Sequence, residues 1–241
     1  NLTLIEDCCE SMGAKYNNKF VGSFGRVASF SFYYSHHITT LEGGICVTND
    51  FEFSEMMKII RAHGWIRQIE NKDKWLKEYK EFDPKFLFVN EGYNLRITEP
   101  QAAMGLLQID KIDNFIEKRK ENARNYFQNL SQYSDFLNFQ KVENKSDSSH
   151  FGFPIVIKNN KYFNRDRICS YLNNKGIETR PIIAGNMARQ PANKLFETRI
   201  SGDLKNSDII MDNGFSIGVH QSLCDESINY VLGIFKNFFK E

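Results

Sequence analysis

The sequence has few of the features that mark membrane, nucleic-acid-binding or disulfide-bonded proteins. No apolar run approaches the roughly 20 residues that a membrane-spanning helix needs. The 31 basic and 30 acidic side chains give a net charge of +1. Neither sign forms a long run of the kind that binds nucleic acid or an anionic membrane surface. We therefore expect neither nucleic acid nor a membrane among the partners of this protein.

Cysteine is also scarce, and its spacing excludes the common metal and disulfide frameworks. The five cysteines include no CxxC pair. Cys8 and Cys9 are adjacent in the chain, which is poor geometry for a shared metal ion or a bridge. Because thiols stay reduced in the cytoplasm, we expect a cytoplasmic protein with no signal peptide and no bound metal.

What the sequence does contain is an ordinary globular composition with one informative stretch. Its 241 residues, 41% hydrophobic and 25% charged, suffice for one large or two modest domains. Residues 28–33 predict a strand, the polar turn after it holds His36 and His37, and residues 45–48 predict a second strand. An apolar run upstream, which we expect to be a buried strand, ends in Asp7. Acids at strand ends and histidines after strands indicate a site at the mouth of an α/β sheet.

The flanking segments predict helices through their capping residues. Asn49 and Asp50 favour a helix start, with the helix running to about Arg61. Thr98 and Gln101 form a capping box before a second helix. The segment between them, residues 68–90, predicts a charged and irregular excursion or lid. A long amphipathic helix follows, with residues 117–121 on its solvated face.

The rest of the chain predicts a small α/β lobe of two short strands and two helices. The strands are expected at residues 151–157 and 177–183, and the first helix at residues 166–174 with Gly176 as its stop signal. Residues 193–212 are polar and typical of turns. A serine–aspartate pair at residues 222 and 225 predicts the start of the last helix, which runs through Phe239.

Several motifs together are similar to those of a known family. They are IEDCCESMGAKYNNKFVGSFG and SFSFYYSHHITTLEGG in residues 5–44, GYNLRITEPQAAMG in residues 92–105, and GIETRPI in residues 176–182. This pattern resembles the DegT/DnrJ/EryC1/StrS family of nucleotide-sugar aminotransferases, which use pyridoxal 5'-phosphate. The resemblance covers nearly the whole chain.

The resemblance implies a fold and an assembly. The fold would be the α/β fold of type I pyridoxal-phosphate-dependent transferases, like that of aspartate aminotransferase. Residues 1–115 would be the C-terminal half of the large cofactor-binding domain, which in the family begins well before Asp7, and residues 116–241 the small C-terminal domain. The family also implies a homodimer with shared active sites.

One departure from the family pattern changes the expected reaction. Family aminotransferases carry a lysine in a stretch like SFYPTKNLTTGEGG, where this sequence has SFYYSHHITTLEGG with His36 at the lysine position. The substitution resembles the dehydratase branch of the family, which uses pyridoxamine 5'-phosphate. His36 would be the catalytic base and acid that removes the C3 hydroxyl of a nucleotide-linked 4-keto-6-deoxyhexose. Neutral histidine, with an ordinary pKa of about 6.5, suits that task.

The resemblance also assigns residues to the cofactor. Asp7 would pair with the pyridine nitrogen, and Glu10, where the aminotransferases usually have glutamine, would lie near the phenolic oxygen. Ser31 would hold the phosphate group, and Asn94 would reach the phosphate of the neighbouring subunit. L-Glutamate would restore pyridoxamine phosphate in a separate half-reaction.

The stretch RAHGWIR looks much like its counterpart in the dehydratase branch, and this resemblance makes His63 and Arg67 the candidate substrate-binding residues. An arginine there would meet a diphosphate or a sugar hydroxyl. His37 is expected to be structural, because consecutive residues do not share a face. A metal site of His36, His37 and Glu42 is disfavoured, because adjacent histidines lack the usual ligand spacing.

Other functions stay open at this point. The favoured substrate is GDP-4-keto-6-deoxy-D-mannose, and the alternatives are another nucleotide ketosugar, an aminotransferase-like reaction, or a degenerate cofactor-binding homologue without activity. A related class of dehydratases carries an iron–sulfur cluster on cysteines. Residues 65–94 contain no cysteine, so that cluster would have no ligands there.

Overall fold

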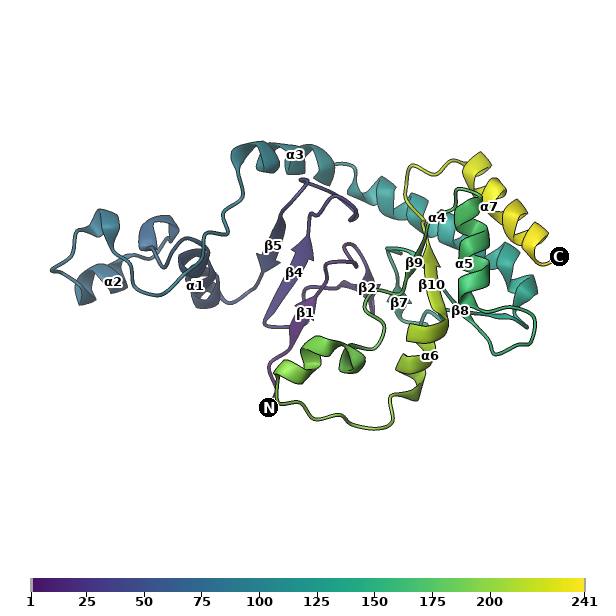
Figure 1. Ribbon diagram of the computed structural model, residues 1–241. Coiled ribbons are helices and arrows are strands. Elements are labelled where there is room, and N and C mark those ends of the chain that lie inside the picture. The colour runs from purple at the N-terminus through teal and green to yellow at the C-terminus, as the bar shows by residue number, and fades with distance from the viewer. Residues whose placement is uncertain (1, 241) are drawn as a thin grey trace. The chain divides into compact units, whose positions relative to one another are not determined.

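The computed structural model describes residues 2–240, which divide into two compact units. Unit 1 runs through Ile112 and unit 2 starts at Asp113. Both contain strands and helices (Figure 1), so the α/β content expected from the sequence is confirmed.

Unit 1 is built on a three-stranded sheet with strand order β1-β4-β5. The strands are β1 (Ile5–Asp7), β4 (Val27–Ser31) and β5 (Gly44–Val47). β1 is parallel to β4, and β4 is antiparallel to β5. The strands expected before and after His36 are therefore confirmed to within a few residues.

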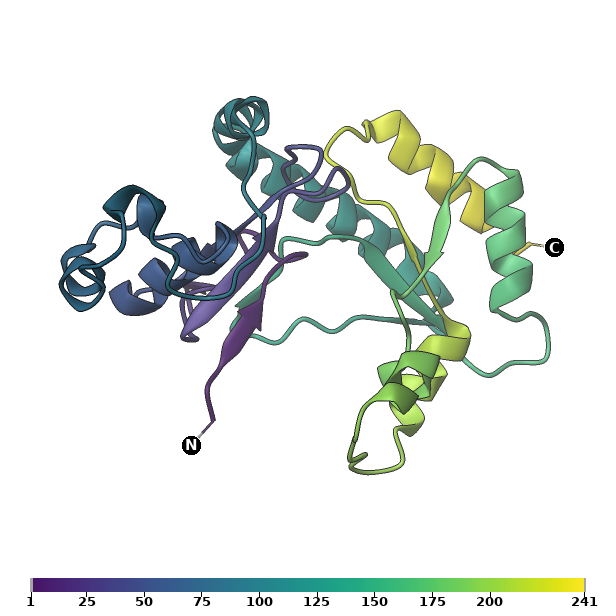
Figure 2. The same ribbon diagram turned by 60° about the vertical axis from the view of Figure 1, so that its left-hand side comes forward.

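A hairpin and five helical segments complete unit 1. β2 (Lys15–Tyr16) and β3 (Lys19–Phe20) pair across Asn17 and Asn18, whose φ angles of 50° and 61° are those of a type I′ turn. The helical segments are α1 (Phe51–Arg61), η1 (Ile66–Gln68), α2 (Asp73–Glu78), η2 (Pro84–Phe86) and α3 (Glu99–Ile109). The excursion between α1 and α3 lies on the side of α1 away from the sheet (Figures 1 and 2).

Both helix caps predicted in unit 1 are present. The Asp50 side chain accepts a hydrogen bond from the Phe53 N–H group at 3.0 Å. Gln101 Oε1 accepts from the Thr98 N–H group at 3.0 Å, and both halves of the expected capping box are present.

The expectation of a buried first strand is wrong for the described residues. Leu4 and Ile5 are exposed, Ile5 to 68%. β1 lies at the edge of the sheet and pairs with β4 alone among the described strands. A short apolar run predicts a strand. Whether that strand is buried depends on the other strands and helices that pack against it, and the run itself does not specify these.

Unit 2 is a four-stranded antiparallel sheet packed with helices. Its strands are β6 (Leu137–Phe139), β8 (Phe153–Ile157), β10 (Gly214–Ile217) and β9 (Thr179–Pro181), in that spatial order. Its α-helices are α4 (Ile112–Leu130), α5 (Arg165–Asn174), α6 (Lys205–Asn213) and α7 (Asp225–Phe238). The shorter segments are β7 (Ser146–Asp147), η3 (Ser131–Tyr133), η4 (Met187–Arg189) and η5 (Pro191–Leu195). α5 and α7 pack side by side (Figure 2).

Four expectations for unit 2 are corrected. Where two strands and two helices were expected, its described residues form a sheet of four strands and four α-helices. Arg119 lies on the inner side of α4, not on a solvated face, and is only 1% exposed. Its guanidinium donates to Gln221 and to the carbonyl groups of His150 and Phe151, and burial lowers its pKa to about 10.

The other two corrections concern helices. Residues 205–213 are helical although turns were expected there. The last helix begins at Asp225 with Cys224 as its N-cap residue, because Ser222 bonds instead to His220 Nδ1. None of the helices between residues 2 and 240 has the length and apolar character required to cross a membrane.

Candidate active site

Asp7 and Ser31 lie at the same edge of the unit 1 sheet. Each is the last residue of its strand, and the two strands are parallel neighbours, with Asp7 opposite Ser29. Parallel strands that end together present their last residues at the same end of the sheet, and Ser31 lies two residues beyond the partner of Asp7, on the same face of β4. Ser31 Oγ accepts from the Tyr33 N–H group at 3.2 Å, which leaves its own proton to donate.

Two carboxyl groups with opposite pKa shifts lie at this end of the sheet, where β1 and β4 finish. Hydrogen bonds from the Cys9 side chain and backbone lower the pKa of Asp7, so this exposed carboxylate stays ionised. Burial, with a contribution from Asp7, raises the pKa of Glu10. Glu10 lies on a turn closed by a hydrogen bond from Ser11 N to Cys8 O. Asp7 is therefore ready to pair with a cation, whereas Glu10 holds a proton more readily.

Glu6 fixes the end of β1 from the opposite face. Its carboxylate accepts from the N–H groups of Gly22, Phe24 and Gly25 at 2.7, 2.7 and 2.6 Å. Burial raises the pKa of Glu6. The three hydrogen bonds and the charge of Lys19 lower it by more than burial raises it, so the net shift of the pKa is downward. The strand end that carries Asp7 is thus clamped to the turn before β4.

His36 lies on the loop between β4 and β5, residues 32–43, which we call the His36 loop. Its N–H group donates to Tyr33 O at 3.0 Å, and its ring meets the Tyr33 ring edge-on at 5.9 Å between centroids. His36 is half-buried, whereas His37 is 1% exposed. The burial of His37 agrees with its expected structural role.

A second group of candidate residues lies between α1 and α3. The His63 N–H group donates to Tyr93 O at 2.8 Å, and Ala62 and Asn94 form an antiparallel bridge. Arg96 joins the two candidates, with Nε donating to Asn94 Oδ1 at 3.1 Å and one terminal nitrogen 3.5 Å from His63 Nε2. The motifs predict His63 and Asn94 as site residues. Arg96 was not predicted, although it lies two residues after Asn94 in the same motif.

Arg67 lies on an aromatic platform. Its guanidinium carbon is 5.0 Å from the centroid of the Trp65 ring. Trp65 stacks with Phe86 and with Phe88, at 5.8 and 5.7 Å between ring centroids, and its indole N–H group donates to Lys85 O. An arginine supported on a ring face keeps its charged end exposed for an anionic ligand.

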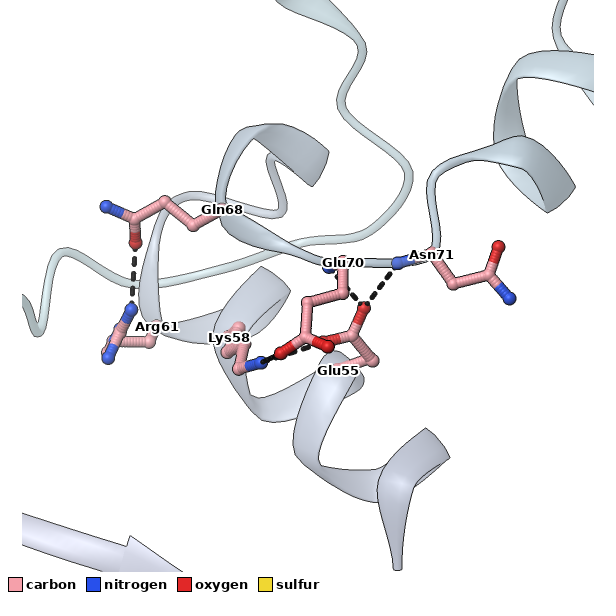
Figure 3. Close-up of polar contacts among 6 residues, drawn as sticks. All are labelled: Glu55, Lys58, Arg61, Gln68, Glu70 and Asn71. Atoms are coloured by element: carbon pink, nitrogen blue, oxygen red, sulfur yellow. Dashed lines mark hydrogen bonds and ion pairs between the residues drawn. The ribbon is translucent and has the colours of Figure 1, made fainter.

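Side chains of α1 fasten the short helix that carries Arg67 (Figure 3). Glu55, 7% exposed, accepts from the N–H groups of Glu70 and Asn71 at 2.7 and 3.0 Å and from Lys58 at 2.9 Å. Burial raises the pKa of Glu55, and these donors more than offset it, so the net shift is downward. The carboxylate therefore stays charged and holds the chain just beyond Arg67.

A second bond from α1 reaches the same segment. Arg61 donates to Gln68 Oε1 at 2.8 Å (Figure 3), and Ile66 and Ile69 are buried. Gly64, with φ of +82°, packs its backbone against Asn90 so closely that no side chain fits. These contacts on both sides of Arg67 are not visible in the sequence, because no short motif joins α1 to residues 68–71.

The comparisons with known proteins agree with the motifs. The model of the DegT/DnrJ/EryC1/StrS aminotransferase family matches residues 1–236. GDP-4-keto-6-deoxy-D-mannose 3-dehydratase of Escherichia coli O55:H7 is 38% identical over 239 residues, which cover 98% of this chain and 61% of that protein. The chain thus spans about three fifths of the length of this relative.

Solved structures are similar as well. The E. coli GDP-4-keto-6-deoxy-D-mannose 3-dehydratase with bound hydrated PLP matches with a TM-score of 0.86 and 35% identity, over 97% of this chain and 60% of that one. A GDP-4-keto-6-deoxymannose 3-dehydratase with a trapped PLP-glutamate geminal diamine matches with a TM-score of 0.84 and 34% identity, over 97% and 60% of the two chains. The fold expected from the motifs, that of type I pyridoxal-phosphate enzymes, is confirmed.

Proposed function

The chain belongs to the DegT/DnrJ/EryC1/StrS aminotransferase family, and on that basis we propose that the protein is a pyridoxamine-phosphate-dependent 3-dehydratase. It would remove the C3 hydroxyl group of a nucleotide-linked 4-keto-6-deoxyhexose, with GDP-4-keto-6-deoxy-D-mannose as the first candidate. The observation that carries this proposal is His36, which occupies the family's lysine position after β4.

His36 suits a base that later acts as an acid. An imidazole cannot form the covalent bond to the cofactor that a lysine amine forms, so it is available to move protons. It would take a proton from the methylene carbon that carries the amine of the cofactor. It would then give that proton to the C3 hydroxyl oxygen of the sugar as the hydroxyl group leaves. Its half-buried place against Tyr33 restricts the ring without removing it from solvent.

The residues at the sheet edge fit a pyridoxal-type cofactor. The ionised Asp7 would keep the ring nitrogen protonated, and Ser31 would donate to the phosphate group. Glu10, whose pKa is raised, would bond to the phenolic oxygen. When bound, the cofactor would supply an amine for the C4 ketone and a ring that accepts electrons. L-Glutamate would restore that amine.

The second group would bind the substrate and the partner subunit's cofactor. Arg67, held over Trp65, would contact the diphosphate of the nucleotide sugar, and His63 would contact the sugar or phosphate beside it. Asn94 would reach the phosphate of the neighbouring subunit, as in the family. A homodimer is also supported by the exposed apolar side chains of unit 1, among them Leu95, Ile97, Leu106 and Leu107. We further propose that residues 1–115 belong to the cofactor domain and residues 116–241 to the small domain. The enzyme would act in the cytoplasm, in the colitose branch of O-antigen synthesis.

A turnover assay tests the reaction. The intact gene product, supplied with pyridoxal phosphate, L-glutamate and GDP-4-keto-6-deoxy-D-mannose, should release ammonia and a 3-deoxy ketosugar, both detected by mass spectrometry. The same assay with a CDP-linked ketohexose tests the nucleotide. A 4-amino sugar in place of the 3-deoxy product would instead identify an aminotransferase, and this would refute the proposal.

The role of His36 has its own test. His36→Lys should attach the cofactor covalently, so that borohydride reduction followed by mass spectrometry finds the adduct on the peptide that contains residue 36. Tyr34→Lys is a matched control, because Tyr34 is exposed on the same loop and its lysine should stay unmodified. Equal labelling of both variants, or labelling of neither, would contradict the placement of His36.

A further inference from the structure

The Gln101 side chain joins α3 to the His36 loop. Its Oε1 atom accepts from the N–H and hydroxyl groups of Thr98, at 3.0 and 2.8 Å. Its Nε2 atom donates to the carbonyl oxygen of Glu42 at 2.7 Å. One amide group therefore closes the N-terminus of a helix with its oxygen and binds the His36 loop with its nitrogen.

The Glu42 carbonyl is part of the closure of this loop. It also accepts from Thr40 Oγ1 at 2.8 Å. Thr40 N donates to Phe32 O, and Phe32 N donates to Gly43 O, both at 2.9 Å. These bonds draw the two ends of the loop together at Phe32, so the position of His36 between them depends on how residues 40–43 are held.

The backbone at this place needs external support. Leu41 has a φ of +69°, a left-handed conformation that leucine rarely adopts. Its side chain is exposed and contributes little packing to hold it there. Strained residues persist where surrounding contacts fix them, and the bond from Gln101 fixes the residue that follows Leu41.

α3 also lies directly against the loop. A Cβ atom placed on Gly105 would come within 3.2 Å of Thr40 Cγ2, and Thr40 is fully buried. Gly105 and Gln101 are one turn apart on α3, so the helix supports the loop at two points on one side.

We propose that Gln101 is a positioning residue of the active site, which holds the His36 loop through its N–H donor. This inference rests on the proposed function, because His36 is the group that it positions. His36 must reach a carbon and then a hydroxyl oxygen, and small displacements of such a group reduce the rate strongly. Loss of the donor should therefore lower kcat more than it weakens substrate binding.

The variant Gln101→Glu separates the two roles of this residue. Glutamate also serves in a capping box, so α3 should keep its cap, but its carboxylate cannot donate to Glu42 O. Amide hydrogen exchange in residues 39–44 should accelerate about fivefold, the change expected from loss of one hydrogen bond. Exchange in α3 should stay the same, and kcat should fall at least roughly tenfold with KM nearly unchanged.

Thr98→Ala is the matched control. It removes the cap hydroxyl and leaves the bond from Gln101 to Glu42, so exchange should accelerate in the first turn of α3 and not in residues 39–44, and kcat should stay near that of the original protein. Unchanged exchange in residues 39–44 of Gln101→Glu, or an unchanged kcat, would overturn the inference. If the original protein shows no dehydratase activity, the proposed function fails, while the exchange experiment still decides whether Gln101 holds the loop.

Discussion

The two units of this protein are stabilised in different ways. Unit 2 contains one cluster of seventeen buried apolar side chains drawn from α4, α5, α7 and the sheet, with Ile155, Leu172 and Phe235 fully buried. The corresponding cluster around α1 in unit 1 has four members, Ile59, Ile66, Ile69 and Leu87. Since apolar burial is the main favourable term in folding, unit 2 has much the larger share of it.

In unit 1, polar side chains bind backbone groups. Glu6 holds the turn before β4, Glu55 holds residues 70 and 71, and Gln101 holds the His36 loop. Each joins segments far apart in the sequence. Glu6 adjoins Asp7, Glu55 holds the segment just beyond Arg67, and Gln101 holds the loop that carries His36. The candidate site therefore lies in the unit where a few hydrogen bonds, and not a large apolar core, fix the backbone conformation.

The largest expected effect concerns the core of unit 2. Phe235→Ala should cost about 3–5 kcal/mol, because the fully buried ring leaves a cavity. The cost is measured as the change in free energy of opening from amide exchange in β8 and β10. Phe82→Ala, in the excursion between α1 and α3, is the contrast in unit 1: this residue is 53% exposed, and we expect a change within about 0.5 kcal/mol. Similar losses for the two variants would remove the distinction between the units.

A smaller effect is expected at the polar anchor of α1. Glu55→Gln removes the charge that binds Lys58 and weakens the acceptor for two backbone N–H groups, so residues 66–71 should lose about 1–3 kcal/mol of local stability. Because Arg67 lies in this segment, GDP should also bind more weakly, as followed by tryptophan fluorescence.

Glu70→Gln is the control for this anchor. It removes the other carboxylate that pairs with Lys58, at 3.3 Å, but this side chain is 74% exposed. Exposed pairs contribute about 0–1 kcal/mol, so GDP binding should be unchanged. If Glu70→Gln weakens GDP binding as much as Glu55→Gln, the anchor does not act through the buried carboxylate.

Equivalent helix caps allow a direct comparison of the two units. Asp50 caps α1 and Asn164 caps α5 in the same way. In each case the side-chain oxygen accepts a hydrogen bond from the N–H group three residues later, at 3.0 Å. Replacing either with alanine should cost about 1 kcal/mol. In unit 1 the loss should be confined to exchange in α1, whereas in unit 2 it should also appear in β8 and β10, because α5 belongs to the large core. A loss that spreads equally in both would show that unit 1 is as cooperative as unit 2.

The parts of the fold that could be predicted from the sequence are the local ones. The caps at Asp50 and Gln101, the turn at Asn17 and Asn18 and the helical spacing of α4 and α7 depend on residues a few positions apart. The burial of Arg119 depends on Gln221 and on two carbonyl groups distant in the sequence. α6 was missed because its N-cap residue, Leu204, is left-handed and makes no side-chain cap.

The candidate site divides in the same way. The motifs select Asp7, Ser31 and His36 because strand ends and the turn after a strand are short-range features. The contacts that position other parts of the site are long-range: Gln101 binds the His36 loop 59 positions away, and Glu55 binds residues 70 and 71, just beyond Arg67, 15–16 positions away. Such contacts depend on how α1 and α3 pack, and no spacing rule encodes that.

Acid should distinguish the two units, although the changes in stability are the smallest of the series. In unit 2, burial lowers the pKa values of His150 and His220, with Lys120 contributing at His150 and Arg119 at His220. Because the folded pKa lies below the unfolded value of 6.5, this stability is present above pH 6.5 and is lost as the pH falls from there towards the folded pKa. Unit 2 should therefore begin to weaken just below pH 6.5.

In unit 1 the corresponding groups are carboxylates. The net pKa shifts of Glu6 and Glu55 are downward from 4.5, so their contribution persists above pH 4.5 and is lost only as the pH falls below it towards the folded values. Amide exchange measured between pH 7 and pH 4 should thus show β8 and β10 losing protection before residues 22–25 and 70–71. His150→Gln combined with His220→Gln should remove the early loss in unit 2 and leave the later one in unit 1 unchanged. If residues 22–25 lose protection first, the carboxylate anchors do not determine the acid stability of unit 1.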